Sequence, residues 1–211
     1  MLGEVHRIAN IVTEFTRFAR LPAPNPEPCD LAQAARGVVT LHASNPDGAE
    51  SPGGPRVELI VEAIPMVTAD RDQMIQVLTN LIQNGLDAAS AARPDPRVVV
   101  TIGPLPKDRV RIVVRDNGPG VPEAMEARLF EPYATTKEKG TGLGLAICQR
   151  IVFEHGGEIT YRKGTKGGAV FEFSLPIAGP SLLERPPPTD ITGRPLESPK
   201  TARPAPGGEK P

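Results

Sequence analysis

Two asparagines in the segment NLIQNGLDA, Asn80 and Asn84, carry the clearest chemical signal in this sequence. A spacing of four residues places both side chains on one face of a helix. Asn is a poor helix former, and these two lie among leucines and an isoleucine. Their amide oxygens suit a hard cation such as Mg²⁺, which keeps several waters and is commonly bridged to substrate phosphates. The alternative is that both side chains simply face water.

A single carboxylate, Asp116, follows the apolar run VRIVV in the stretch RDNGPGVP. Gly118, Gly120 and two prolines surround it, and these residue types favour turns. The stretch is therefore either a simple turn at a strand end or a site where a carboxylate meets a ligand. In the second case the glycines would let the chain pass close beside that ligand.

The segment GTGLGLAI, residues 140–147, has alternate glycines at the start of a helix-like pattern. Exposed amides at a helix N-terminus attract phosphate, and glycines let the backbone approach it. No Gly-Lys-Ser/Thr follows, which excludes a P-loop, and the segment follows a polar loop, which excludes a Rossmann fingerprint. That loop, RLFEPYATTKEKG, has an aromatic-rich start and no periodicity.

The elements that position these residues follow from the hydrophobic pattern. The opening segment EVHRIANIVTEFTRFARL spaces its apolar residues as a helix of a bundle does, and prolines end it. Neighbouring strands without a helix between them exclude a purely doubly wound sheet. The expected fold is α/β: a two-layer sandwich of a mixed β-sheet with helices on one face. Helices are predicted in CDLAQAARGVVTLHA after the N-cap Asp30, in RDQMIQVLTNLIQNGLDAASAA after the N-cap Asp70, near EAMEARLF and in GLGLAICQRIVFEH; strands are predicted in RVELIVEAI, RVVVTI, RVRIVVRD, EITYRK and AVFEFSLP.

The bulk composition of the 211 residues limits the class of function. A net charge of −1 gives no electrostatic reason to expect nucleic acid or a membrane surface as partner. No apolar run approaches the roughly 18 residues that span a bilayer, and no signal peptide is expected. Cys29 and Cys148 lie far apart without metal spacing, so reduced thiols in a cytoplasmic protein are expected.

In their order and spacing these segments resemble the ATP-binding domain of sensor histidine kinases, part of the superfamily that includes gyrase, Hsp90 and MutL. The resemblance rests on NLIQNGLDA, DNGPGV, LFEPYATTK, GTGLGLAI and GGEI. It implies a Bergerat-type ATP-binding fold after an N-terminal bundle helix, and FTRFARLPAP resembles the group of nitrogen-regulation sensors. The implied domains are the second helix of a truncated dimerisation domain in residues 1–22, a linker in 23–29, the ATP-binding catalytic domain in 30–176 and a disordered Pro-rich tail in 177–211.

The resemblance also implies a role for each site residue. Asp116 would accept a hydrogen bond from the adenine amino group and would disfavour guanine, which presents another acceptor there. Asn84 would bind Mg²⁺, with Asn80 beside it near the phosphates. Lys137 would either reach a phosphate or be a solvated lysine of a mobile lid that runs from about residue 120 to residue 140. The other implied nucleotide contacts are Gly118, Gly120, Phe130, which would anchor the lid, Gly140, Thr141, Gly142, Leu143 and Gly144.

Two departures from the family pattern shape the expected reaction. Hydrolysing members carry a Glu base where this chain has Asn80, and an amide cannot take a proton from water effectively. None of His6, His42 and His155 lies in the motif of a phosphate-accepting histidine, so the acceptor is expected upstream in a longer protein or on a partner. His155 ends a helix, where a cation would favour the helix dipole.

The implied activity is transfer of the ATP γ-phosphoryl group to that histidine, and from there to an Asp of a response regulator receiver domain. The full-length protein would dimerise through its dimerisation helices and would lie in the cytoplasm, either free or attached to a membrane. Two alternatives remain open. One is an ATP-gated protein-interaction module without phosphotransfer, and the other is a serine kinase of the anti-sigma type.

Overall fold

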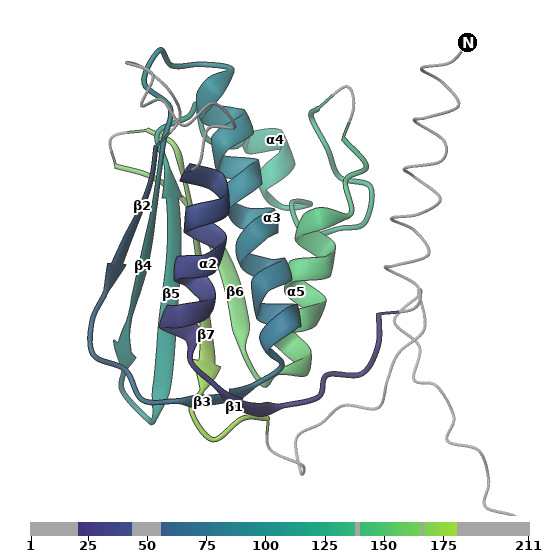
Figure 1. Ribbon diagram of the computed structural model, residues 1–211. Helices are drawn as coiled ribbons and strands as arrows, with labels where there is room; N and C mark the ends of the chain where they lie inside the picture. Colours follow the sequence, from purple (N-terminus) through teal and green to yellow (C-terminus); the bar gives the residue numbers. More distant parts are fainter. Residues whose placement is uncertain (1–20, 44–55, 138–139, 166, 181–211) are drawn as a thin grey trace, which may run out of the picture.

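The computed structural model describes residues 21–43, 56–137, 140–165 and 167–180. Their elements form two layers, a mixed five-stranded sheet and a layer of helices that covers one of its faces (Figure 1). The α/β sandwich predicted from the sequence is thus confirmed. Within the described ranges, no helix combines the length and the apolar character needed to cross a membrane.

The sheet has the strand order β2-β4-β5-β7-β6. β2 (Arg56–Val61) pairs in parallel with β4 (Arg97–Leu105), and the chain crosses between them through a helix, as parallel pairing requires. β5 (Arg109–Asp116), β7 (Ala169–Pro176) and β6 (Glu158–Lys163) complete the sheet with antiparallel pairs. Antiparallel strands can be joined by a short hairpin, which explains why β5 follows β4 and β7 follows β6 without a helix between them.

β4 runs three residues beyond the end of the strand predicted in RVVVTI. Leu105 pairs with Arg109, which leaves a connection of three residues, Pro106, Lys107 and Asp108, between the strands. Lys107 and Asp108 both have positive φ, of 64° and 52°. Residues with positive φ are typical of the short connections in tight hairpins, whose backbone must match the twist of the two strands.

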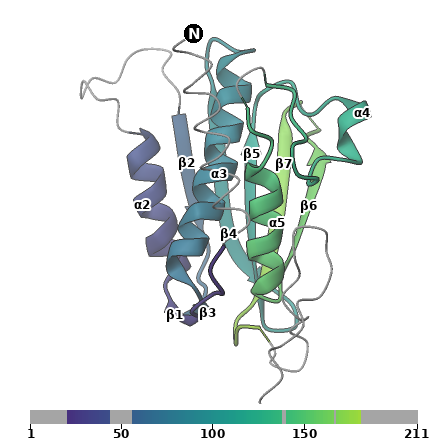
Figure 2. The same ribbon diagram turned by 90° about the vertical axis from the view of Figure 1, so that its right-hand side faces the viewer.

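The three longer helices lie side by side in front of the sheet, and Figure 2 shows this layer face on. α2 (Leu31–Ala43) and α3 (Arg71–Ser90) begin after the predicted N-caps. Asp30 Oδ1 accepts a hydrogen bond of 2.9 Å from the Gln33 N–H at the start of α2. Asp70 Oδ1 accepts hydrogen bonds from two backbone N–H groups at the start of α3. α5 (Gly144–Glu154) is the third, and α4 (Glu123–Glu126) is only about one turn long.

A small second sheet was not predicted. β1 (Glu27–Cys29) pairs antiparallel with β3 (Val67–Ala69), and strands of three residues are too short to show a hydrophobic period. β1 falls in the segment 23–29 that was predicted to be a linker, yet Cys29 is 3% exposed and belongs to the core. Packing of this domain therefore begins before residue 30.

The core lies between the helices and the sheet, and alternation along β5 explains how the sheet contributes to it. Val110, Ile112 and Val114 are buried, while the residues between them are more exposed. Asp116 continues the same alternation and is the last residue of the strand, so its carboxylate also points toward the helices. The strand thus places a single charged side chain at the edge of an apolar core.

The predictions for the first and last segments of the chain concern residues 1–20 and 181–211, which lie outside the described residues. Of the predicted bundle helix, only Leu21 and Pro22 are described, and neither is helical. Of the predicted tail, residues 177–180 are described and follow β7 directly.

Candidate functional site

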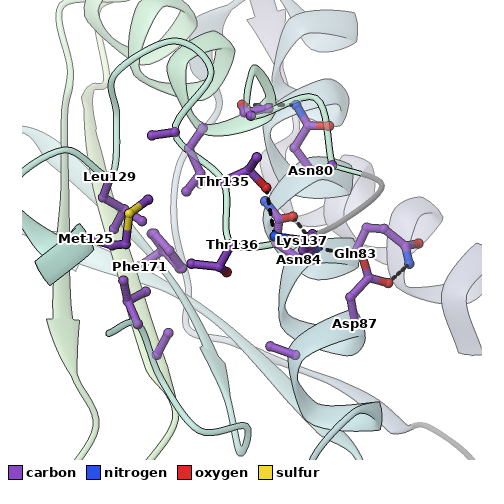
Figure 3. A pocket seen from close by; sticks show the side chains of 18 of the residues that line it. Asn80, Gln83, Asn84, Asp87, Met125, Leu129, Thr135, Thr136, Lys137 and Phe171 are labelled. Atoms are coloured by element: carbon purple, nitrogen blue, oxygen red, sulfur yellow. Dashed lines mark hydrogen bonds and ion pairs between the residues drawn. The ribbon is translucent and has the colours of Figure 1, made fainter. Parts of the chain in front are cut away.

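A cavity of about 430 Å³ opens between α3, the segment before α5 and the start of β7. One wall is polar, because α3 contributes Asn80, Gln83, Asn84 and Asp87 (Figure 3). The opposite wall is apolar and consists of Met125, Leu129 and Phe171. A cavity with one apolar wall and a few convergent polar groups is the usual form of a small-molecule site.

Asp116 lines this cavity and is only 5% exposed. Its Oδ1 accepts hydrogen bonds from the backbone N–H of Gly118, at 2.8 Å, and of Ala169, at 3.1 Å. Burial raises the pKa of the Asp116 carboxyl above its ordinary value of 3.8, and the two N–H groups oppose that shift. One carboxylate oxygen is thus fixed by the backbone, and the other is available to a hydrogen-bond donor in the cavity.

Two glycines outside the predicted set allow the backbone to surround Asp116. A Cβ on Gly85 of α3 would lie 3.0 Å from Val98 Cγ2 and 3.2 Å from Asp116 Cβ. Gly168 has a φ of 81°, and a Cβ there would overlap the Asp116 carbonyl oxygen. The signals in the sequence were the glycine of QNGLD and the double glycine before β7, but their role depends on a contact between distant segments.

The predicted asparagine pair lies on the cavity face of α3, as the spacing of four requires. Asn80 Nδ2 donates a long hydrogen bond of 3.4 Å to the Gly144 carbonyl at the start of α5. Asn84 Oδ1 accepts a hydrogen bond of 3.0 Å from Lys137 Nζ. Neither amide therefore faces bulk water alone, and the alternative of two solvated polar positions is not supported by their placement.

Lys137 crosses the cavity from the polar loop to α3 (Figure 3). Besides Asn84, its ammonium contacts Asp87 Oδ2 at 2.7 Å. The pair formed by Asn84 Oδ1 and Asp87 Oδ2 thus already accepts a cation. Asp87 was not predicted, although its position three residues after Asn84 places it on the same helical face.

The polar loop closes on itself where Tyr133 meets Gly142. The Tyr133 N–H donates a hydrogen bond of 3.0 Å to the Gly142 carbonyl. Both residues have positive φ, of 68° and 69°. A Cβ on Gly142 would lie 2.5 Å from the Tyr133 carbonyl carbon, so only glycine fits this contact. The contact sets the position of the cavity wall that precedes α5.

Most predicted site residues meet at this cavity, and three do not line it. Phe130 packs edge-on against Phe171, with ring centroids 6.4 Å apart, and so supports the apolar wall from behind. Leu143 is completely buried just before α5, and Gly118 serves Asp116 through its N–H. The predicted residues that line the cavity are Asn80, Asn84, Asp116, Gly120, Lys137, Gly140, Thr141, Gly142 and Gly144.

The apolar lining was missed by sequence reasoning. Met125, Leu129 and Phe171 are ordinary core residue types, and nothing in their local sequence separates a cavity wall from a core. Thr135 and Thr136 also line the cavity, in a loop that has no periodicity. Only the three-dimensional arrangement identifies these residues.

His155 differs from its prediction as a cation at a helix end. The side chain is 1% exposed, its Nε2 accepts a hydrogen bond of 3.0 Å from the Asp70 N–H, and its Nδ1 lies 2.7 Å from the Ile151 carbonyl. Nδ1 must therefore carry the proton and Nε2 must be unprotonated, so the ring is neutral. The imidazole joins the end of α5 to the start of α3.

Comparison with known proteins gives this cavity its context. Residues 69–179 match the family described as histidine kinase-, DNA gyrase B-, and HSP90-like ATPases. The chain is 37% identical over 187 residues to the nitrogen regulation protein NtrY of Azorhizobium caulinodans, which covers 85% of this chain and 23% of NtrY. The chain therefore spans about a quarter of the length of this relative.

Solved structures show the same fold. The catalytic domain of histidine kinase ThkA superposes with a TM-score of 0.62 at 31% identity, over 73% of this chain and 97% of that one. ShkA in complex with AMPPNP gives 0.67 at 30% identity, over 85% and 38%. ThkA in complex with the response regulator TrrA gives 0.67 at 27% identity, over 84% and 49%. With more than half of its residues matched to the family, the chain belongs to the histidine kinase-, DNA gyrase B- and HSP90-like ATPases.

Proposed function

We propose that this chain binds ATP in the cavity beside α3 and acts as the catalytic domain of a sensor histidine kinase. The observation that carries the proposal is the buried Asp116 carboxylate, with one oxygen held by two backbone N–H groups and the other open to the cavity. Such an acceptor suits the amino group of adenine and is costly opposite the carbonyl oxygen of guanine. Family membership and the named kinases support this assignment.

Mg²⁺ would be held beside the phosphates by Asn84. The donor set fits a hard cation, because Asn84 Oδ1 and Asp87 Oδ2 already accept the Lys137 ammonium. Within the described ranges, no three His, Cys, Asp or Glu side chains come together as a metal cage. The cation would therefore take its other ligands from ATP and water, and when bound it would neutralise charge on the transferring phosphoryl group.

Phosphoryl transfer is favoured over hydrolysis at this site. Asn80 holds the position of the base in hydrolysing relatives, and its amide nitrogen donates to the Gly144 carbonyl. An amide in that role orients groups and takes no proton. The backbone at the start of α5, with Gly140, Thr141 and Gly142 on the cavity wall, would grip the triphosphate.

The accepting histidine is proposed to be none of His6, His42 and His155, and to lie upstream in a longer protein or on a partner. His155 is buried with both ring nitrogens in hydrogen-bond contacts, so it cannot attack a phosphate. His42 is bonded to the Val38 carbonyl of its own helix and does not line the cavity. The whole protein would then dimerise, phosphorylate a dimerisation-helix histidine and pass the group to a response regulator, all on the cytoplasmic side.

A labelling experiment tests this function. The chain is incubated with Mg²⁺ and γ-labelled ATP, with and without a dimerisation fragment that carries an accepting histidine. We expect label on the fragment that is lost in acid and retained in base, as phosphohistidine is, and none on a His→Ala fragment. Acid-stable label on the chain itself, retained without His6, His42 and His155, would instead indicate a serine kinase. Intact ATP binding without any label would indicate an ATP-gated interaction module.

A further inference from the structure

We propose that Asp87 is a positioning residue that holds Lys137 at the Asn84 amide oxygen until Mg²⁺ and nucleotide displace it. The contact between Asp87 and Lys137 is a property of the protein alone. Displacement rests on the proposed function, because it requires nucleotide in the cavity, and each of the two is tested by its own experiment.

The geometry of Asp87 supports a holding role. Its Oδ2 lies 2.7 Å from Lys137 Nζ, and its Oδ1 accepts a hydrogen bond of 2.7 Å from Gln83 Nε2. Gln83 lies one helical turn before Asp87, so the pair is a favourable i,i+4 contact on α3. Both carboxylate oxygens are therefore engaged, and the side chain has a fixed direction toward the cavity.

Hydrogen bonds hold both the backbone N–H and the side-chain ammonium of Lys137. Its backbone N–H donates to Thr135 Oγ1 at 3.0 Å, which orients the loop. Its ammonium bridges Asn84 Oδ1 and Asp87 Oδ2, which lie 53 and 50 residues away in sequence, at the middle of the polar wall (Figure 3). Lys137 thus occupies the oxygen that the proposed function assigns to Mg²⁺.

A metal ion and an ammonium cannot share the Asn84 oxygen. Their like charges repel strongly at hydrogen-bond distances. Metal binding must therefore move Lys137 away, and the nearest compensating charge is then the triphosphate that arrives with the metal. One side chain would alternate between Asp87 in the free protein and a phosphate in the complex.

The solvent exposure of the ion pair makes this exchange reversible. The side chains of Lys137 and Asp87 are 41% and 42% exposed, and partly exposed ion pairs are held weakly. The contact is thus strong enough to bias where Lys137 lies and weak enough for a charged ligand to break. Lys137 would thus contact the α3 wall of the cavity in the free protein and a phosphate in the complex.

The first test needs no nucleotide. Acetylation of the full chain by an amine-reactive ester is followed by mass spectrometry at Lys137 and at the exposed Lys107. An ammonium held by two acceptors reacts slowly. We expect Lys137 to react more slowly than Lys107 in the wild type, and Asp87→Asn to raise the rate at Lys137 several-fold. Asp87→Glu should restore the slow rate, which a general structural role would not do.

Glu131→Gln is the matched control, because it removes the same charge from the neighbouring loop. Glu131 pairs with Arg128 and not with Lys137, so its substitution should leave the rate at Lys137 unchanged. Equal rates at Lys137 in the wild type and in Asp87→Asn would overturn the holding role. An equal acceleration by Glu131→Gln would overturn it as well.

The second test measures coupling in nucleotide binding. Calorimetry with AMPPNP and Mg²⁺ compares Lys137→Gln in the wild-type and Asp87→Asn backgrounds. With Asp87 present, Lys137 only exchanges one anion for another, so its loss should cost little affinity. Without Asp87, its loss should cost about threefold more. Equal losses in both backgrounds would contradict displacement. Failure of every variant to bind AMPPNP would refute the proposed function, while the acetylation result would still decide the holding role.

Discussion

At the scale of single residues, Asp116 illustrates how a binding group opposes stability. Burial raises the pKa of its carboxyl above 3.8, so the folded state binds the proton more tightly than the unfolded state. The contribution of Asp116 to stability is therefore greatest below pH 3.8 and is lost as the pH rises through its folded pKa. At neutral pH this carboxylate lowers the free energy of unfolding.

Replacing Asp116 by Asn should remove that penalty. The Asn oxygen can still accept from the Gly118 and Ala169 N–H groups, but it carries no charge. We expect Asp116→Asn to be at least as stable as the wild type at pH 7, with a difference that grows as the pH rises above 4. Denaturant unfolding across pH measures this difference. A variant that is less stable at every pH by a constant amount would contradict the argument.

Gly142 provides a second prediction at this scale. Ala there would adopt a positive φ and meet the Tyr133 backbone at 2.5 Å, so Gly142→Ala should destabilise the fold by about 2 kcal/mol or more and slow phosphoryl transfer more than it weakens adenine binding. Gly144→Ala is the control, because its Cβ would meet nothing closer than 3.9 Å. Equal unfolding midpoints for the two variants would show that the loop adapts.

At the scale of elements, the features that were predicted correctly depend only on residues that are neighbours in the sequence. The N-caps Asp30 and Asp70 and the alternation along β5 each act within a few residues, and each prediction is confirmed. β1 and β3 were missed because a three-residue strand exists only through its partner. His155 was misjudged because its hydrogen-bond donor, the Asp70 N–H, lies 85 residues away.

Asp70 therefore does more than cap α3. Its Oδ1 accepts from the N–H groups of Asp72 and Gln73, its Oδ2 accepts from the Asn25 N–H at 2.9 Å, and its own N–H binds His155. Asp70→Ala should lower the free energy of unfolding by about 2 kcal/mol, the upper end of the range for a lost cap. Thermal unfolding compared with the exposed Asp72→Ala measures the effect. Similar losses in both variants would mean that the Asp70 carboxylate contacts contribute no more than general charge near the helix start.

At the scale of the whole molecule, the sequence predicted the two layers and the polar half of the cavity. The segments NLIQNGLDA, DNGPGV, LFEPYATTK and GTGLGLAI carry the polar residues, and their resemblance to the ATP-binding domain of histidine kinases implied that they meet. The apolar wall could not be predicted, since Met125, Leu129 and Phe171 gain their role only when β7 and the loop after β5 come together. The domain was predicted to begin at residue 30, because residues 22–29 lack a hydrophobic pattern that would reveal the pairing of β1 with β3.

Truncation tests the extent of the domain. Removal of residues 1–20 keeps β1, the Pro22 carbonyl that accepts from Gln73 Nε2, and Asn25. We expect this variant to bind ATP as the full chain does and to associate less, since the apolar stripe predicted for the opening segment is gone. Removal of residues 1–29 also deletes β1 and buried Cys29, and should cost about 2 kcal/mol or more. Equal stability of the two truncated chains in urea would place the domain start at residue 30.

The central claim, that a buried carboxylate makes this cavity an adenine site, is tested most directly by titration calorimetry with ATP and GTP in the presence of Mg²⁺. For the wild type we expect ATP to bind at least about tenfold more tightly than GTP, because guanine would leave the Asp116 acceptor opposite another acceptor. Asp116→Asn should lose most of that preference while remaining folded. Equal affinities for ATP and GTP in the wild type, or a preference for ATP that Asp116→Asn leaves intact, would contradict the claim.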